Sequence, residues 1–99
     1  MLSEKIENGK QLGVEVRIKK SNIFFWYSYA IQKYRNTYYV YECEISENNM
    51  YNEKYEYETI KKYYSLVDVQ NDFPEKYGLK FTDIHTLKGQ HIFNVNFYI

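Results

Sequence analysis

The chain has 99 residues, a length that suits one domain with a single hydrophobic core. Its 13 basic and 13 acidic side chains give a formal net charge of zero, so it lacks the surplus of lysine and arginine that marks a simple nucleic-acid-binding protein. No apolar leader and no apolar run near the ~20 residues of a membrane span is visible, and the one cysteine, Cys43, cannot form an internal disulfide, so we expect a cytoplasmic protein.

Hydrophobic alternation predicts four strands in the first two thirds of the chain. Residues 12–19 alternate strictly between apolar and polar side chains, as a half-buried strand does. Residues 23–33 are apolar on both faces, which indicates a central strand or one that is covered on both sides. Turn residues stand between the runs, with Ser21-Asn22 before the second strand and Arg35-Asn36 before the third. The expected strands are 12–19, 23–33, 37–45 and 54–63, with a polar loop at 46–52.

A helix is expected after the fourth strand. Ser65 followed by Asp68 is an N-terminal capping signature. Pro74 removes a backbone donor inside the helical pattern, which predicts a kink or two short helical pieces. Gly78 is suited to close the helix.

The end of the chain returns to a strand-like pattern. Residues 79–87 are expected to be irregular, and the alternation of residues 91–98 predicts a last strand. For the first eight residues, a short helix and an extended arm both remain open. The chain, 1–99, is therefore expected to form a single α+β domain: an antiparallel β-meander of about four strands, then a kinked helix packed on the sheet and a C-terminal strand.

No group of residues in the sequence points to catalysis or to a cofactor. The histidines, His85 and His91, are not accompanied by a motif of nucleophilic enzymes. Cys43 lies in the middle of an expected strand, where an inert buried thiol is the simplest interpretation. Metal-ligand spacings and glycine-rich phosphate loops are also missing. We therefore expect a protein that is not an enzyme and that needs neither a metal nor another cofactor.

The stretch 38–60 is the most unusual part of the chain, with six tyrosines, six glutamates and a single lysine before Ile60. From Glu42 to Glu58 the net charge is −5, and the rest of the chain must carry +5. Glu42 and Glu44 share a face of the third strand, and Glu56 and Glu58 share a face of the fourth. If the register places both pairs on one surface, four carboxylates gather there, and something must offset their repulsion.

An acidic surface edged with tyrosines suits a protein partner with a basic surface, such as a nuclease. Our hypothesis is a small non-enzymatic inhibitor of bacterial or phage origin that blocks a basic or nucleic-acid-binding protein, as immunity proteins and anti-CRISPR or other anti-defence proteins do. No membrane partner is expected, and the oligomeric state is left open. The residues expected to bind the partner are Glu42, Glu44, Tyr51, Glu53, Glu56 and Glu58.

Other interpretations compete with this hypothesis. The glutamates could pair inside the chain with Arg17, Lys19, Lys33, Lys61 or Lys62, in exposed pairs that contribute only ~0–1 kcal/mol each. The number of tyrosines is explained by AT-rich codons. Four of the tyrosines can pack in the hydrophobic core instead of forming a binding surface: Tyr27, Tyr29, Tyr39 and Tyr41. Two other functions are an accessory protein that stacks single-stranded nucleic acid on an aromatic sheet face and a structural subunit of a larger assembly.

Overall fold

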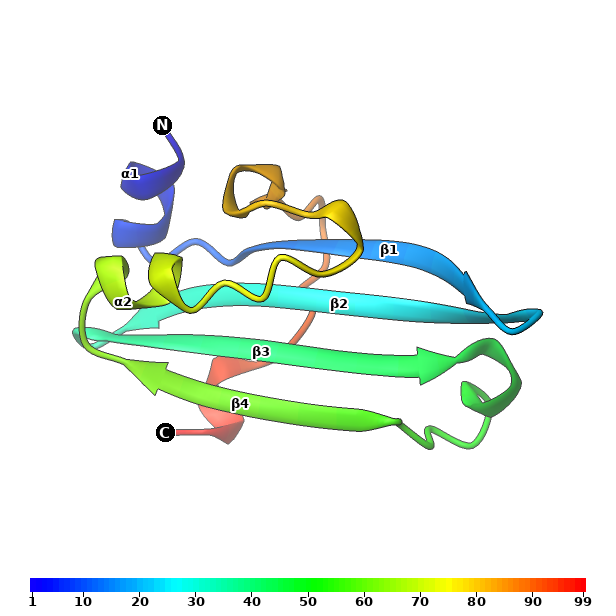
Figure 1. The fold of residues 1–99 in the computed structure, drawn as a ribbon. Helices are drawn as coiled ribbons and strands as arrows, with labels where there is room; N and C mark the ends of the chain where they lie inside the picture. The colour runs from blue at the N-terminus through cyan, green and yellow to red at the C-terminus, as the bar shows by residue number, and fades with distance from the viewer.

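The computed structural model describes all residues, 1–99, and shows an antiparallel five-stranded sheet with two short helices, an α+β fold as expected (Figure 1). The strands lie in the order β4-β3-β2-β1-β5. Each α-helix has six residues, far fewer than a membrane-spanning helix needs. The helices and strands are α1 (Leu2–Glu7), β1 (Leu12–Lys20), β2 (Ile23–Tyr34), β3 (Thr37–Ser46), β4 (Tyr57–Tyr63), α2 (Leu66–Asn71) and β5 (His85–Thr86), and the 3₁₀ turns are η1 (Glu47–Asn49), η2 (Lys76–Gly78), η3 (Phe81–Asp83) and η4 (Val95–Phe97).

Two-residue turns join the first three strands. Ser21 and Asn22 both have positive φ, 49° and 67°, and Arg35 and Asn36 repeat this geometry at 50° and 64°. Consecutive left-handed residues are typical of the tight turns whose twist matches antiparallel strands. The three strands therefore form a continuous meander, as the sequence predicts.

The sheet separates two hydrophobic clusters. The helix face carries the larger cluster, and α1, α2 and the irregular segment after α2 cover it (Figure 1). The opposite face, called the back face here, is covered only in part, by the C-terminal segment that passes behind the sheet (Figure 1). The centre of β2 is buried on both sides, from Tyr27 to Ile31, as expected for a strand with two apolar faces. Of the tyrosines expected in the core, Tyr27, Tyr29, Tyr39 and Tyr41 are all buried.

The expected kinked helix is shorter than the sequence pattern indicates. Its start is confirmed, because the Ser65 hydroxyl accepts a hydrogen bond from the Asp68 backbone at 3.2 Å. The α-helix ends at Asn71, and after Pro74 the chain makes only η2. Residues Glu75 and Tyr77 have positive φ, 51° and 57°, which an α-helix cannot accommodate. The result is two short helical pieces rather than one bent helix.

The expected C-terminal strand at 91–98 is wrong. The fifth strand is His85–Thr86, which pairs with Leu12 and Gly13, and the later residues cross the back face without joining the sheet. The buried Gln11 side chain binds this segment: its Oε1 accepts from the backbone of Ile92 at 2.7 Å and of Phe93 at 3.2 Å, and its Nε2 donates to the Phe93 carbonyl at 2.8 Å. Hydrogen bonds from one side chain thus hold the segment where backbone pairing between strands was expected. The alternating apolar residues of the segment, Phe93 and Val95, are buried against the sheet.

Candidate protein-binding surface

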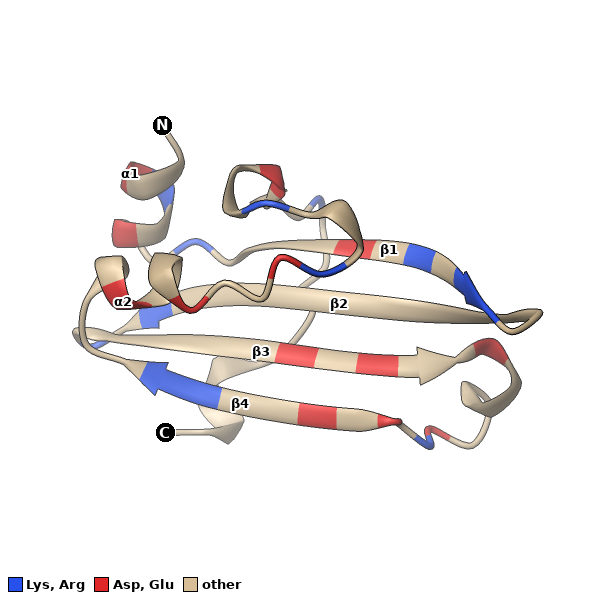
Figure 2. Ribbon diagram, viewed as in Figure 1, with Lys and Arg blue, Asp and Glu red and all other residues tan.

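The register of β3 and β4 divides the glutamates that we expected to share one surface. Glu44 lies opposite Tyr57, and Cys43 lies opposite Glu58. Because side chains alternate along each strand, Glu42 and Glu44 face the helix side while Glu58 faces the back. The acidic residues of both strands gather toward the same end of the sheet (Figure 2), but on opposite faces of it.

Glu44 is part of the protein interior. Its side chain is buried, forms an ion pair with Lys20 and accepts a hydrogen bond from the Tyr77 hydroxyl at 2.6 Å. Burial alone raises the pKa of Glu44, and the hydrogen bonds from Lys20 and Tyr77 outweigh it and bring the pKa below its ordinary value. Glu44 therefore offers almost no surface to a partner.

Glu42 is held in the same way. Lys76 lies 3.1 Å from its carboxylate, and the Tyr27 hydroxyl donates to it at 2.8 Å. Lys76 also donates to the Tyr57 hydroxyl at 2.8 Å. Burial alone lowers the pKa of Lys76, but the contacts with Tyr57 and Glu42 prevail and raise it. Glu42 and Glu44 thus attach the segment around η2 to the sheet, and their cations are Lys76 and Lys20 rather than the basic residues that the sequence suggested.

The other four predicted residues are exposed. Tyr51, in the loop between β3 and β4, is 96% exposed, and Glu53, Glu56 and Glu58 all face solvent. None of the five ion pairs in the structure involves these three glutamates. Met50 and Tyr55 are exposed beside them. We call residues 50–58 the acidic segment: it combines carboxylates without cations and exposed apolar side chains in one continuous stretch.

A groove of about 500 Å³ lies on the back face next to the acidic segment. Its floor comes from β2 and β3, and its two walls come from the acidic segment and from the start of the C-terminal segment. Twelve residues line it: Glu15, Trp26, Ser28, Tyr41, Cys43, Ile45, Met50, Glu53, Tyr55, Gln90, His91 and Ile92. The groove holds two carboxylates, three large aromatic side chains and no lysine or arginine.

Sequence reasoning did not single out Glu15 or Trp26. The two-residue turn at Ser21-Asn22 could have placed Glu15, because that turn pairs it with Ser28 of β2, and the Ser28 hydroxyl donates to the Glu15 carboxylate at 3.1 Å. Trp26 is fixed by Glu47, which accepts from its indole nitrogen at 2.9 Å and from Arg17. The position of Glu47 after the strand gave no signal for this contact.

Cys43 lies in the floor of the groove, and its thiol is buried. Burial raises the pKa of this thiol, and nearby Glu58 and Glu15 add to the effect, while hydrogen bonds with Tyr41 and Ser28 oppose it. The thiol therefore stays protonated at neutral pH, which fits an apolar floor rather than a nucleophile. No group of three or more His, Cys, Asp or Glu side chains is arranged to hold a metal ion.

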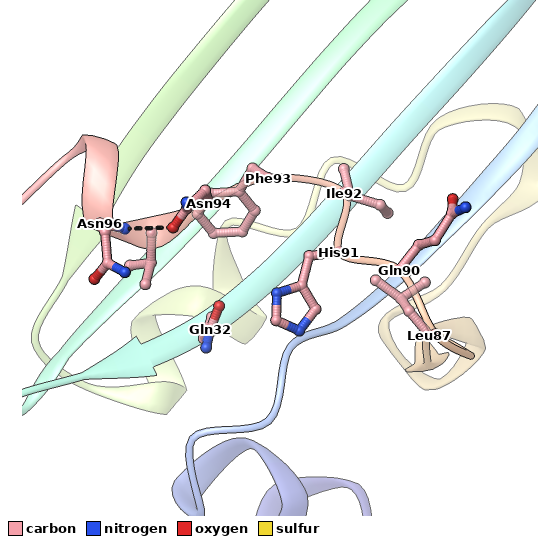
Figure 3. Close-up of a pocket in the computed structure, with 10 residues that line it drawn as sticks. Gln32, Leu87, Gln90, His91, Ile92, Phe93, Asn94 and Asn96 are labelled. Atoms are coloured by element: carbon pink, nitrogen blue, oxygen red, sulfur yellow. Dashed lines mark hydrogen bonds between the residues drawn. The ribbon is translucent and has the colours of Figure 1, made fainter.

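A second hollow, of about 760 Å³, lies beside the end of β2 (Figure 3). Gln32 and residues of the C-terminal segment from Leu87 to Asn96 line it, and His91 is its one titratable side chain. Asn94 is already engaged, since its side chain accepts from the Asn96 backbone at 3.0 Å, the contact drawn in Figure 3. This hollow offers amide groups but no carboxylate, lysine or arginine, so the groove has the richer chemistry. Comparison of the chain with family models, with curated proteins and with solved structures gave no match.

Proposed function

We propose that the protein is a small non-enzymatic inhibitor that acts by binding another protein with a basic surface. The observation that carries this proposal is the acidic segment: Glu53, Glu56 and Glu58 are exposed and have no cation within ion-pair distance. Exposed Tyr51 and Tyr55 stand among them. Uncompensated carboxylates steer a basic partner toward the surface, and tyrosines supply contact area with few rotatable bonds.

The carboxylates and tyrosines of the acidic segment indicate which kind of protein the partner is. A surface of carboxylates and tyrosines competes with a phosphate backbone for a basic cleft, so a nuclease or another nucleic-acid-binding protein is the target that we favour. Among small inhibitors, immunity proteins and phage-encoded anti-defence proteins, including anti-CRISPR proteins, act in this way. We place the protein in this class as a working hypothesis, with a bacterial or phage origin.

Direct binding of single-stranded nucleic acid receives less support from the structure. Tyr39 and Tyr41, on the back face, are buried, and the groove that remains open there carries Glu15 and Glu53, which repel phosphate. A structural subunit would need a broad apolar patch on β2. Of that strand's large apolar side chains only Ile23 is well exposed to solvent, at 38%.

The test compares two double reversals that change the net charge equally. Glu53→Lys/Glu56→Lys removes carboxylates from the acidic segment, and Glu4→Lys/Glu75→Lys removes exposed carboxylates elsewhere. Each variant and the wild type are used to capture proteins from a lysate of the native host, and the captured protein is purified and assayed for activity. We expect the wild type and the Glu4/Glu75 variant to inhibit it at a one-to-one ratio, and the Glu53/Glu56 variant to bind it at least about tenfold more weakly, which is the loss of about 1.4 kcal/mol.

Two results would overturn the proposal. One is a Glu53/Glu56 variant that is folded by circular dichroism and inhibits the captured protein as strongly as the wild type does. The other is capture of nucleic acid with an affinity that survives the reversal and falls steeply with added salt, since that result would identify the nucleic-acid-binding alternative.

A further inference from the structure

The groove on the back face is lined by two carboxylates, Glu15 and Glu53, that form no ion pair. Glu15, on β1, lies at one side of it, and Glu53, in the acidic segment, lies at the other. Glu15 accepts a hydrogen bond from Ser28 but has no cation within ion-pair distance, and Glu53 has none either. The nearest basic residue on the same face of β1 is Arg17, and its guanidinium is already bound to Glu47.

The surfaces between these carboxylates are aromatic and aliphatic. Trp26 lies in the floor, Tyr55 and Met50 form one wall, and Ile92 belongs to the other. Trp26 is held in place by its hydrogen bond to Glu47, so its ring is a fixed surface rather than a mobile one. Aromatic faces attract cations, and the aliphatic stem of a basic side chain packs on apolar groups while its charged end reaches carboxylates.

We infer that the groove receives a basic side chain of the partner protein, and that arginine fits it best. This inference rests on the proposed function and adds to it the residue type that the partner contributes. Arginine is favoured over lysine because its planar guanidinium stacks on aromatic rings and binds carboxylates in a bidentate manner. The volume of about 500 Å³ lies within the ~300–1,000 Å³ of pockets that enclose small ligands, so one side chain enters without rearrangement of the sheet.

The chain itself uses this mode of recognition once, immediately beside the groove. The guanidinium of Arg17 lies 3.6 Å from the centroid of the Phe24 ring, and it binds both carboxylate oxygens of Glu47, at 2.5 and 3.0 Å. An aromatic ring from β2 and a carboxylate from η1 are thus sufficient to hold an arginine on this face. The groove presents the same two groups, in larger number and without an occupant from the chain.

The experiment exploits the fact that Trp26 is the only tryptophan in the chain, so its fluorescence reports occupancy of the groove directly. The probe is Nα-acetyl-L-arginine methylamide, and the comparison compounds are the lysine and norleucine analogues, of which norleucine has a similar apolar stem without charge. Glu15→Gln/Glu53→Gln removes both carboxylates of the groove. Glu4→Gln/Glu75→Gln is the matched control, since it removes two exposed carboxylates elsewhere.

We expect a saturable change in Trp26 fluorescence with the arginine probe, weaker binding of lysine, and a dissociation constant at least about tenfold higher in the Glu15/Glu53 variant than in the control variant. Equal responses to arginine and norleucine, or no saturation with arginine, would overturn the inference. An equal response in the two variants would do the same. These results are separable from the proposed function: loss of partner inhibition in the Glu53→Lys/Glu56→Lys variant together with a silent arginine titration would leave the inhibitor proposal standing and reject the groove.

Discussion

The stability of a Lys20 variant tests whether Glu44 is a structural residue of the interior or a residue that binds a partner. Lys20→Met keeps the apolar stem of the lysine but leaves the Glu44 carboxylate buried, with the Tyr77 hydroxyl as its remaining donor. Glu44→Gln has a milder effect, because the amide oxygen of the new side chain still accepts from Tyr77 and the Lys20 side chain, 44% exposed, turns to water. We therefore expect Lys20→Met to destabilise the protein more than Glu44→Gln does.

The expected loss of unfolding free energy depends on whether the Glu44 carboxylate stays charged without its cation or becomes protonated. A lost hydrogen bond between charged groups costs about 1.5–3 kcal/mol, and an unpaired buried charge costs up to about 5 kcal/mol. Protonation limits this cost, since neutralising a glutamate of ordinary pKa at pH 7 requires only about 3.7 kcal/mol. We expect a loss of about 3 kcal/mol for Lys20→Met and about 1 kcal/mol for Glu44→Gln at pH 7.

The pH dependence has a definite sign. In the wild type the pKa of Glu44 is lowered, so its contribution to stability is present above the ordinary glutamate pKa and is lost as the pH falls through the folded-state pKa. Without Lys20, burial is the dominant influence and the pKa of Glu44 rises, so the variant regains stability as its carboxylate is protonated. The difference between wild type and Lys20→Met therefore shrinks from about 3 kcal/mol at pH 7 to under about 1 kcal/mol at pH 4.

Urea unfolding measures these quantities, with Trp26 fluorescence and far-ultraviolet circular dichroism as the two probes. The free energy of unfolding is compared at pH 7, 5.5 and 4 for the wild type and the two variants. Equal losses for Lys20→Met and Glu44→Gln at pH 7, or a loss for Lys20→Met that does not change with pH, would refute the assignment of Glu44 to the interior. Such a result would restore Glu44 as a candidate for partner binding.

Three further predictions test the other structural assignments. Gly13→Ala should lower stability by about 2 kcal/mol in urea unfolding, because a Cβ there would lie 2.5 Å from the Tyr29 carbonyl and 2.8 Å from the Ile92 side chain; unchanged stability would contradict this packing. Gln11→Ala should cost about 2–3 kcal/mol and speed hydrogen exchange at the amides of residues 92 and 93, which lose their acceptor, whereas unchanged exchange would show that another group binds them. Because burial raises its pKa, the Cys43 thiol should react with a disulfide reagent at pH 8 far more slowly than in the urea-unfolded chain, and equal rates would contradict its burial.

The meander was predictable because each strand carries its own signal. Residues 12–19 alternate, and Arg35-Asn36 supplies the left-handed pair that a two-residue turn requires, so local sequence and final structure agree. The cap at Ser65 was predictable for the same reason, since its donor lies only three residues away at Asp68. Features that depend on nearby residues are accessible to sequence reasoning.

The C-terminal segment was not predictable, because its alternation has the same form whether it joins a sheet or lies across one. Phe93 and Val95 alternate as in a strand, yet the backbone groups of Ile92 and Phe93 are bound by Gln11, about eighty residues away in the chain. The groove could not be predicted from the sequence for the same reason. One of its walls is the segment that carries His91 and Ile92, and nothing local places that segment opposite Tyr55.

The division of the acidic residues depends on a single residue of register between β3 and β4. Each even-numbered residue of β3 lies opposite an odd-numbered residue of β4, so Glu44 and Glu58 must face opposite sides of the sheet. A slip by one residue would bring Glu58 onto the helix face beside Glu42, where like charges repel. It would also turn Tyr63 away from Asp72, which accepts from its hydroxyl at 2.7 Å, and Tyr57 away from Lys76.

The packing of β4 therefore opposes the arrangement that would gather four carboxylates on one surface. Tyr63 packs against the helix-face cluster and Ile60 against the back-face cluster, and a slip would exchange these faces. The register that this packing selects keeps Glu58 away from the helix face, where Lys76 and Lys20 pair with Glu42 and Glu44. The later glutamates are therefore left without cations. Glu53 and Glu15, which form no ion pair, lie on the two sides of the groove. The position of Glu53 and of the glutamates that follow it is a consequence of core packing rather than of the acidic composition itself.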